Sequence, residues 1–481
     1  MGTAQAEPYG RAAGESWEAG MAVGSGNPLL AGLIEEAGLS NKEFARRLNV
    51  RAIAAGEAAS YTHTSVKNWT VRGMQPRDAI VPFITNILGE ALERPVTEAE
   101  LGYASTSARP CPGALFPRDP AEALRGVADF WSTMDRREFL SVGTSAFAAS
   151  AFTAPVTRWL TVAADPPVSG LAGRRIGRDD VNTLWHAAAL ARKQDSRFGG
   201  GDWRTSAIAR TLRVQAAPML RGSYSDEIGR RLFTAAAELS RAVGWSAVDM
   251  GDHHAAQRHL THALRLARLA GDVQSGCYVL STMALQTFLA GHPAEAADMA
   301  EGAYERARHD AAPRVLAFAK LAEARAHARL GPAHARDAGA ALHQAEALLD
   351  QVRAEDDPPW LAYFTHARLA TDAVEIHRDL AQPQAALRWS SQAGAMSKND
   401  FTRAVGLRTA VVGATYMQAG ELEEGLVNGH QAVDILASVE SARARTYVAD
   451  LLAAAGRWKR HPGIRELALR ANREMRVPLP V

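Results

Sequence analysis

The chain has little of what several classes of protein require. Its 481 residues include two cysteines, Cys111 and Cys277, which are too few for a disulfide framework and fit a reducing compartment. No run of about 18 apolar residues is free of charged or turn residues, so we expect no membrane-spanning helix. Residues 1–27 contain no basic segment followed by an apolar run, so we expect no secretory signal and place the protein in the cytoplasm.

Strong net charge is also missing. The 54 basic and 52 acidic residues leave a net charge of +2, which excludes a protein that coats nucleic acid along its whole surface. A small basic module within a neutral chain remains compatible with this balance.

The patterns of catalysis and metal binding are missing as well. No nucleophile elbow and no Ser-His-Asp order stands in the setting of a hydrolase, so we do not expect an enzyme. The histidines His253, His254, His259 and His262 lack a His-Glu-x-x-His pattern and have no cysteine partners. We therefore expect neither a metal nor a cofactor, and place these histidines on the surface or between helical hairpins.

The sequence that is present divides into five parts. Glycine, alanine and glutamate without periodicity predict a disordered tail over residues 1–27. Short helical patterns fill residues 28–104, and the proline-rich segment 105–120 predicts a linker. Connector helices are expected over 121–169, and helical spacing with few prolines continues over 170–481. The predicted fold class is all-α.

The C-terminal part repeats itself. Turns with glycine or proline recur at Gly251, Gly291 and Gly331, then at Leu380–Pro383 and at Gly420, mostly about 40 residues apart. Each turn is followed by a helix with small residues at close-packing positions and then by a second helix. One such hairpin cannot bury its apolar face alone, so the units must stack. The pattern predicts a tetratricopeptide-like helical-hairpin solenoid, with a period longer than the usual 34 residues.

We expect the N-terminal domain to form a set of short helices. Ser40 and Glu43 form a capping box for one helix. Thr62 can cap the next helix, in which Val66 and Trp69 face inward while the polar residues between them face outward. Such a helix can bind a partner through its polar side.

The segments Phe44-Ala45-Arg46-Arg47-Leu48 and Ser65-Val66-Lys67-Asn68-Trp69, followed by Gly73 and Pro76, resemble the lambda-repressor-like (XRE-type) helix-turn-helix domain. The chain departs from that family in a longer connection, residues 51–61, which would alter the angle at which the helices dock. The resemblance implies binding of double-stranded DNA, with the second helix in the major groove. It implies base contacts from His63, Thr64, Lys67 and Asn68, and phosphate contacts from Asn41, Lys42, Arg46, Arg47, Arg72 and Arg77.

The local charge of this domain is modest. Residues 40–78 contain seven basic and three acidic residues, a balance of +4. A single module of this charge needs a second copy to reach useful affinity, so we expect a homodimer. The alternative is a scaffold whose small N-terminal domain docks protein and touches no DNA.

Residues 190–310 carry a second resemblance. Arg192–Trp203 with its triple glycine, Ala235–Leu239 and Gly244–Asp249 are similar to actinobacterial regulators that join an XRE-type domain to tetratricopeptide-like repeats. That resemblance implies control of development or secondary metabolism, with a peptide, a small molecule or a protein as the ligand of the solenoid groove.

The triple glycine itself, Gly199, Gly200 and Gly201, lacks the Gly-Lys-Ser/Thr ending of a phosphate loop. Beside it, Arg192, Asp195 and Arg197 can form a polar pocket or a hinge. A nucleotide-dependent regulator that uses this turn stays an alternative.

Overall fold

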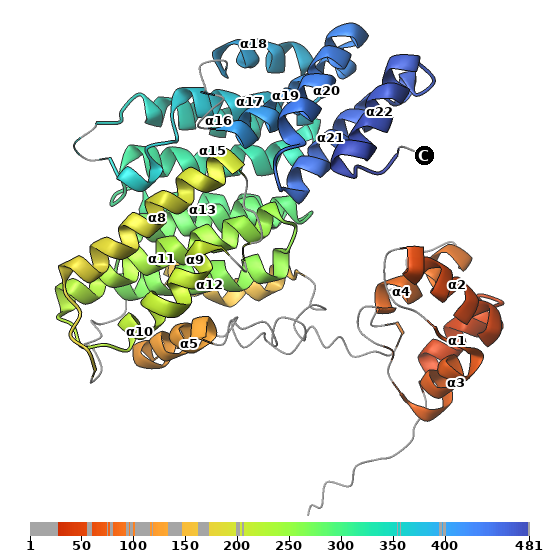
Figure 1. Ribbon diagram of the computed structural model, residues 1–481, viewed down its shortest axis with the longest axis horizontal. Helices are drawn as coiled ribbons and strands as arrows, with labels where there is room; N and C mark the ends of the chain where they lie inside the picture. The colour runs from red at the N-terminus through yellow and green to blue at the C-terminus, as the bar shows by residue number, and fades with distance from the viewer. Residues whose placement is uncertain are drawn as a thin grey trace, which may run out of the picture. The chain divides into compact units, whose positions relative to one another are not determined.

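A computed structural model describes the chain as two compact units, residues 1–108 and 109–481 (Figure 1). The described residues are 27–54, 60–74, 76, 80–92, 96, 100–101, 116–117, 119–132, 147–161, 173–198, 203, 206–353, 355, 357–393, 397 and 401–479. Their regular elements are all helical, and their one pairing of extended backbone is an isolated bridge between Arg175 and Ser223. The all-α prediction is confirmed.

Several predicted features fall outside the described residues. They are the tail up to residue 26, nearly all of the linker and residues 133–146 and 162–172 of the connector. Within the described part, no helix combines the length and the apolar character needed to cross a lipid bilayer.

The described part of the N-terminal unit contains four helices. They are α1 (Pro28–Glu36), α2 (Asn41–Ala54), α3 (His63–Arg72) and α4 (Val81–Ala91). Asn27 caps α1, since its Oδ1 accepts a hydrogen bond from the Leu30 amide at 3.0 Å. The Asn27 amide group also donates to the Leu101 carbonyl at 2.7 Å, which ties the start of the unit to its end.

Apolar faces of all four helices form the core of this unit. Phe44, Leu48 and Val66 are fully buried, and Trp69 is nearly so. The inward orientation predicted for Val66 and Trp69 is therefore confirmed. Gly73 ends α3 in the left-handed conformation at φ 66°, which glycine adopts without steric cost.

The C-terminal unit begins with elements that cover the repeats. They are α5 (Pro120–Ser132), the 3₁₀ turn η3 (Ala149–Phe152), α7 (Thr153–Thr161), α8 (Arg178–Phe198), α9 (Ala207–Thr211), the π-helical turn η4 (Leu212–Ala216) and α10 (Ala217–Leu220). Helix α5 buries Leu124, Val127 and Trp131 in the core that it shares with η4 and α10. Trp159 of α7 packs so closely on α13 that a Cβ added at Gly276 would lie 2.3 Å from its Nε1.

Helical hairpins make up the rest of this unit. Their helices are α11 (Asp226–Asp249), α12 (His253–Ala270), α13 (Val273–Leu289), α14 (Pro293–Ala307), α15 (Pro313–Arg329), α16 (Ala335–Leu349), α17 (His366–Asp379), α18 (Pro383–Ala393), α19 (Thr402–Ala419), α20 (Leu422–Leu436), α21 (Ala442–Ala454) and α22 (Pro462–Met475), with short turns η5 (Pro332–His334), η6 (Pro359–Leu361) and η7 (Gly456–Trp458). From α11 to α21, each odd-numbered helix packs on the next odd-numbered one, so these helices form one layer (Figure 1). Each hairpin thus buries its apolar face against its neighbours, as the repeats predicted.

The predicted turns are left-handed at one residue each. Gly251, Gly291, Gly331 and Gly420 have φ between 80° and 100°. Ala381 takes the same role at φ 56°, although it carries a Cβ. The recurring turn therefore contains a residue with positive φ even where the sequence provides no glycine.

The layer of odd-numbered helices curves back on itself. Helix α8 packs on both α11 and α19, and α11 also contacts α21. The first and last parts of the repeat array therefore meet, and their inner faces enclose a cavity.

Candidate nucleic-acid interface and ligand cavity

Helix α3 presents a polar face to solvent. His63, Thr64 and Lys67 are exposed, and Asn68 is half-buried beside the buried Trp69. With 3.6 residues per turn, positions 63, 64 and 67 lie on one side of the helix. Val71 extends this side by one turn and is 59% exposed. The structure thus brings the four predicted base-contacting residues to the first two turns of one helix.

Asn49 fixes the connection that precedes α3. Its Nδ2 donates a hydrogen bond to the Tyr61 carbonyl at 2.7 Å, and its Oδ1 accepts one from the Tyr61 amide at 2.8 Å. This two-point contact, the Asn49 clamp, joins the end of the long connection to α2. The residues inserted before Tyr61 therefore do not leave the start of α3 untethered.

The start of α3 is ordered by two further contacts. The Tyr61 ring lies edge-on against Trp69 with ring centroids 5.2 Å apart. Ser65 Oγ accepts a hydrogen bond from the Thr62 amide at 3.2 Å, so the first turn of the helix is capped. Together with the Asn49 clamp, these contacts fix where His63 and Thr64 stand relative to α2.

Basic side chains flank this face. Lys42, Lys67 and Arg72 are exposed, and none of them pairs with a carboxylate among the described residues. Asn41 is half-buried at the start of α2, and Arg77 lies outside the described residues. The exposed cations are available to a phosphate backbone.

Glu43 forms ion pairs with two of the residues that are predicted to contact phosphate, Arg46 and Arg47. It accepts hydrogen bonds from Arg46 Nη2 at 2.8 Å and from Arg47 Nε at 2.9 Å. The bonds from Arg46 and Arg47 lower the pKa of Glu43 to about 2, so its charge persists at neutral pH. The Ser40 hydroxyl caps α2 as predicted, but the Glu43 side chain serves the arginines instead of completing a capping box.

The C-terminal unit encloses a cavity along the inner layer of helices. It contains about 1070 Å³ of empty space, with open solvent at its mouth included. Its charged and aromatic lining consists of Arg192, Asp195, Arg241, Trp245, Tyr278, Phe318, Arg325, Tyr363, Arg368, Asp372, Glu375, Phe401, Arg403, Arg408, Arg443 and Tyr447.

Most of these charges are paired. Glu238, which is 4% exposed, accepts from Arg192 at 2.7 Å and from Arg241 at 2.8 Å. Arg325 donates to Asp372 at 3.0 Å and to Glu375 at 2.7 Å. The surrounding arginines hold the pKa of Glu375 near 2 in spite of its burial. These are buried networks in which each carboxylate contacts two or three guanidinium groups.

One ion-pair cluster joins the two ends of the repeat array. Arg403 of α19 binds Asp195 of α8 at 2.6 Å and Asp249 of α11 at 3.1 Å. Arg443 of α21 binds Asp249 at 3.2 Å and stacks over Trp245 at 5.0 Å. We call this cluster of Asp195, Asp249, Arg403 and Arg443 the latch.

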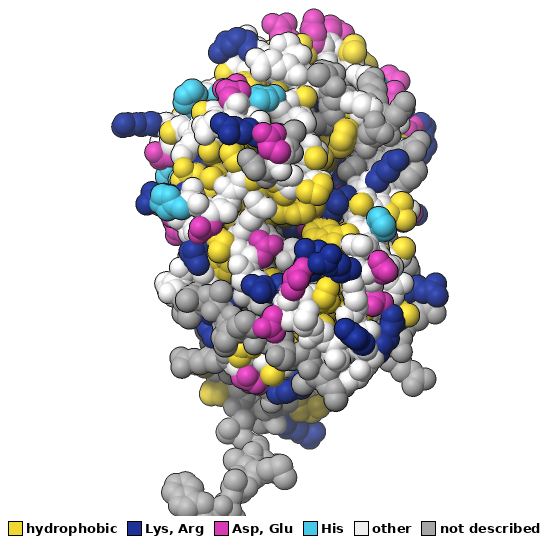
Figure 2. Space-filling model, turned by 90° about the vertical axis from the view of Figure 1, so that its left-hand side faces the viewer, with side chains coloured by type: hydrophobic (Ala, Val, Ile, Leu, Met, Phe, Trp, Pro, Cys, Tyr) yellow, Lys and Arg dark blue, Asp and Glu magenta, His cyan; other side chains and the backbone are white. Residues whose placement is uncertain are grey.

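The surface drawn in Figure 2 carries both signs of charge. Positive and negative side chains are intermixed there around hydrophobic ones. Long-range electrostatic attraction from this face is therefore weak, and binding by it must come from local groups.

One comparison with known proteins concerns the N-terminal unit. Residues 30–104 match the family model of the SP15 N-terminal domain. The matched stretch contains α3 and the Asn49 clamp but none of the repeat hairpins. No curated protein matches the chain.

The structure describes two side chains of the polar pocket or hinge that was predicted beside the triple glycine. Arg192 and Asp195 both line the cavity from α8. Gly199–Gly201 and the side chain of Arg197 lie outside the described residues. Two residues of the predicted polar pocket therefore face one cavity, and a ligand for them stays a prediction.

Of the four histidines of α12, His254, His259 and His262 are buried and His253 is half-buried. The His262 ring stacks on Phe130 of α5 with centroids 4.4 Å apart, and His259 meets Trp203 edge-on at 5.4 Å. Burial lowers the pKa of both imidazoles, to about 3 for His259. Of the two placements that the sequence left open, the one between packed helices applies to this pair.

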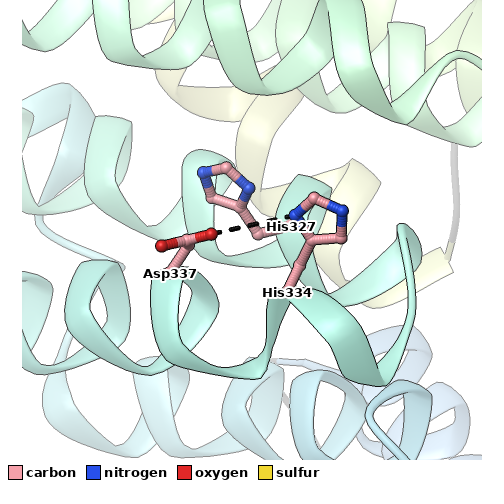
Figure 3. A group of neighbouring side chains, drawn as sticks. All are labelled: His327, His334 and Asp337. Carbon is pink, nitrogen blue, oxygen red and sulfur yellow. Dashed lines mark ion pairs between the residues drawn. The ribbon is translucent and has the colours of Figure 1, made fainter.

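A different histidine pair could hold a metal ion. One nitrogen each of His327 and His334 and one oxygen of Asp337 lie within 4.8 Å of one another at the turn between α15 and α16 (Figure 3). Two imidazoles and a carboxylate are ligands that Zn²⁺ accepts. The side chains of His334 and Asp337 are 41% and 57% exposed, so the ion would be held at the surface. The sequence does not predict this group, because its members lack a recognised ligand spacing.

Most residues of the cavity were not predicted from the sequence either. Arg241, Arg325 and Arg403 are buried on the inner helices, among small and apolar neighbours. An arginine at a core position of an amphipathic helix is unusual, because buried charges need partners. That irregularity within the helical pattern is the signal that could have found them.

Proposed function

We propose that the chain is a cytoplasmic transcription regulator that binds double-stranded DNA as a homodimer and receives a ligand in its repeat unit. The observation that carries the proposal is the polar face of α3, where His63, Thr64 and Lys67 are exposed on a helix held by the Asn49 clamp. An α-helix fits the major groove and reads base edges from the side chains on its outer face.

The flanking cations support the same geometry. Lys42 lies at the start of α2 and Arg72 at the end of α3, so both ends of the helix pair carry positive charge. Phosphate contacts at such positions fix the register of a recognition helix. Because Glu43 neutralises part of the charge of Arg46 and Arg47, one copy would bind weakly, which favours two copies on adjacent half-sites.

The cavity supports the sensing half of the proposal. Its lining combines apolar and aromatic walls with a few convergent charged groups, which is the composition of small-ligand sites. The ligand would regulate DNA binding if it had a higher affinity for one of two arrangements of the repeat array than for the other. The resemblance to actinobacterial regulators supports a role in development or secondary metabolism.

Selection from a random duplex library followed by fluorescence anisotropy tests DNA binding with the full chain. We expect a defined motif, and a loss of at least about 30-fold in affinity for it in a His63→Ala/Lys67→Ala variant, since each of the two base contacts contributes about 1–3 kcal/mol. Lys459→Ala/Arg460→Ala is a control that removes exposed positive charge from the repeat unit and should leave affinity unchanged.

Two outcomes of these experiments would contradict the proposal. If no sequence is enriched and no duplex is bound at low salt, the N-terminal unit docks protein and the chain is a scaffold. If the two variants lose affinity equally, binding is non-specific attraction and α3 does not read bases.

A further inference from the structure

The cavity carries more positive than negative charge. Among the described residues, seven arginines line it, and six of them share five carboxylates: the lining Asp195, Asp372 and Glu375 together with Glu238 and Asp249 behind them. An excess of two positive charges therefore remains along a lining that is partly or fully buried. Buried charge without a partner is costly, so the site favours an anion that completes the pairing.

Arg408 is the clearest member of this excess. It lines the cavity from α19 and donates a hydrogen bond to the Ala393 carbonyl, but it has no carboxylate partner among the described residues. Burial lowers the pKa of its guanidinium because no nearby negative charge compensates for lost hydration. Arg325 Nε, a second buried donor in the lining, lacks a hydrogen-bond partner within the described part of the chain.

Aromatic side chains form the other part of the wall. Trp245, Tyr278, Phe318, Tyr363 and Phe401 line the same cavity. Rings and guanidinium planes both stack on flat molecules, and Arg241 and Arg443 already stack on rings of this set. The lining thus matches a ligand with a planar, largely apolar body.

The latch limits the size of the ligand that the cavity can bind. Because Arg403 joins α19 to both α8 and α11, ion pairs connect the two ends of the repeat array beside the cavity. A peptide lying along the groove would have to break these ion pairs. The remaining space suits a small molecule.

We propose that the cavity binds a small molecule with an aromatic ring and about two negative charges, carried by a phosphate or by carboxylates, with Arg408 as its principal anion-binding residue. The inference rests on the proposed role of the repeat unit as a receptor, but it does not depend on DNA binding. An anionic oxygen near Arg403 competes with Asp195 for the same guanidinium. Ligand binding thereby loosens the contact between α8 and α19 and alters the curvature of the repeat array.

Isothermal titration of the full chain tests the proposal with four probes: phenyl phosphate, isophthalate, benzyl alcohol and inorganic phosphate. We expect one or both aromatic dianions to bind at least tenfold more tightly than benzyl alcohol and inorganic phosphate. Preference between phenyl phosphate and isophthalate then distinguishes a phosphate from a dicarboxylate ligand. If neither aromatic dianion binds at 10 mM, or if all four probes bind alike, the proposal is overturned.

Arg408→Met retains the length and apolar stem of the side chain while removing its charge. It should weaken the dianion at least tenfold, whereas Arg388→Met, an exposed site on α18, should not change the affinity. Circular dichroism confirms that each variant is folded, and Phe401→Leu, which removes one ring of the lining, gives a second variant if Arg408→Met fails to fold. Equal affinity of Arg408→Met and the wild type for the dianion would show that the dianion binds elsewhere.

Anisotropy with the selected DNA, measured on the same preparation, separates the two proposals. If DNA is bound but no dianion is, this inference fails and the proposed function stands. If a dianion binds the cavity but no DNA is bound, the cavity assignment stands and the regulator proposal fails.

Discussion

The Asn49 clamp gives the sharpest prediction about how α3 is held. Asn49→Ala removes two hydrogen bonds, of 2.7 and 2.8 Å, that join α2 to the Tyr61 backbone. Each such bond contributes about 0.5–1.5 kcal/mol, so the local closing free energy should fall by about 2 kcal/mol. That change corresponds to roughly a 30-fold increase in opening of the α2–α3 connection.

Hydrogen exchange followed by mass spectrometry measures this opening. Amides at Tyr61 and in the first turn of α3 should exchange roughly 30-fold faster in Asn49→Ala, while those of α4 should not change. Asn68→Ala is the matched control: it removes the same group from α3 itself and should leave exchange at Tyr61 unaltered while weakening DNA binding. Unchanged exchange at Tyr61 in Asn49→Ala would refute the tethering of the long connection by the clamp.

Three other sites give predictions of their own. Glu43→Gln releases Arg46 and Arg47, so the dependence of log affinity for DNA on log salt should steepen by about 0.9 for each additional phosphate that these arginines bind; an unchanged slope in anisotropy titrations would place the pair away from the phosphates. Burial lowers the pKa of His259 to about 3 from an ordinary 6.5, so at pH 5 the unfolded chain binds a proton that the folded chain does not. Stability should therefore fall by about 2 kcal/mol between pH 7 and pH 5 through this group, and urea unfolding of His259→Asn should lose that part of the pH dependence; an identical pH dependence would contradict the burial of a neutral imidazole. Ala381→Gly should raise the free energy of unfolding by about 1 kcal/mol, because its φ of 56° strains a residue with a Cβ; a decrease would contradict the strain.

The sequence was a good guide where structure is local. Turn residues and 3.6-residue periodicity predicted the hairpins, and Pro383 marked the turn at Ala381 even without a glycine. The inward orientation of Val66 and Trp69 followed from the same periodicity, which also set His63 and Lys67 outward. These features depend on neighbours within one or two helical turns.

The cavity depends on relations that local patterns do not contain. Arg403 meets Asp195 across 208 residues, because the small rotation of each hairpin accumulates until the two ends of the array touch. No feature of either residue in the sequence reports that accumulated curvature. The Asn49 clamp was missed for a similar reason, since it requires the path of the connection back to α2.

Genome-wide immunoprecipitation and sequencing tests the central claim, that α3 reads DNA, most directly. We compare the wild type with a variant carrying His63→Ala, Lys67→Ala and Arg72→Ala, expressed to the same level. If α3 reads DNA, the wild type gives discrete peaks that share a two-part motif and disappear in the variant, with half-sites spaced for a dimer. An absence of peaks in the wild type, or the same peaks in both proteins, would contradict that claim.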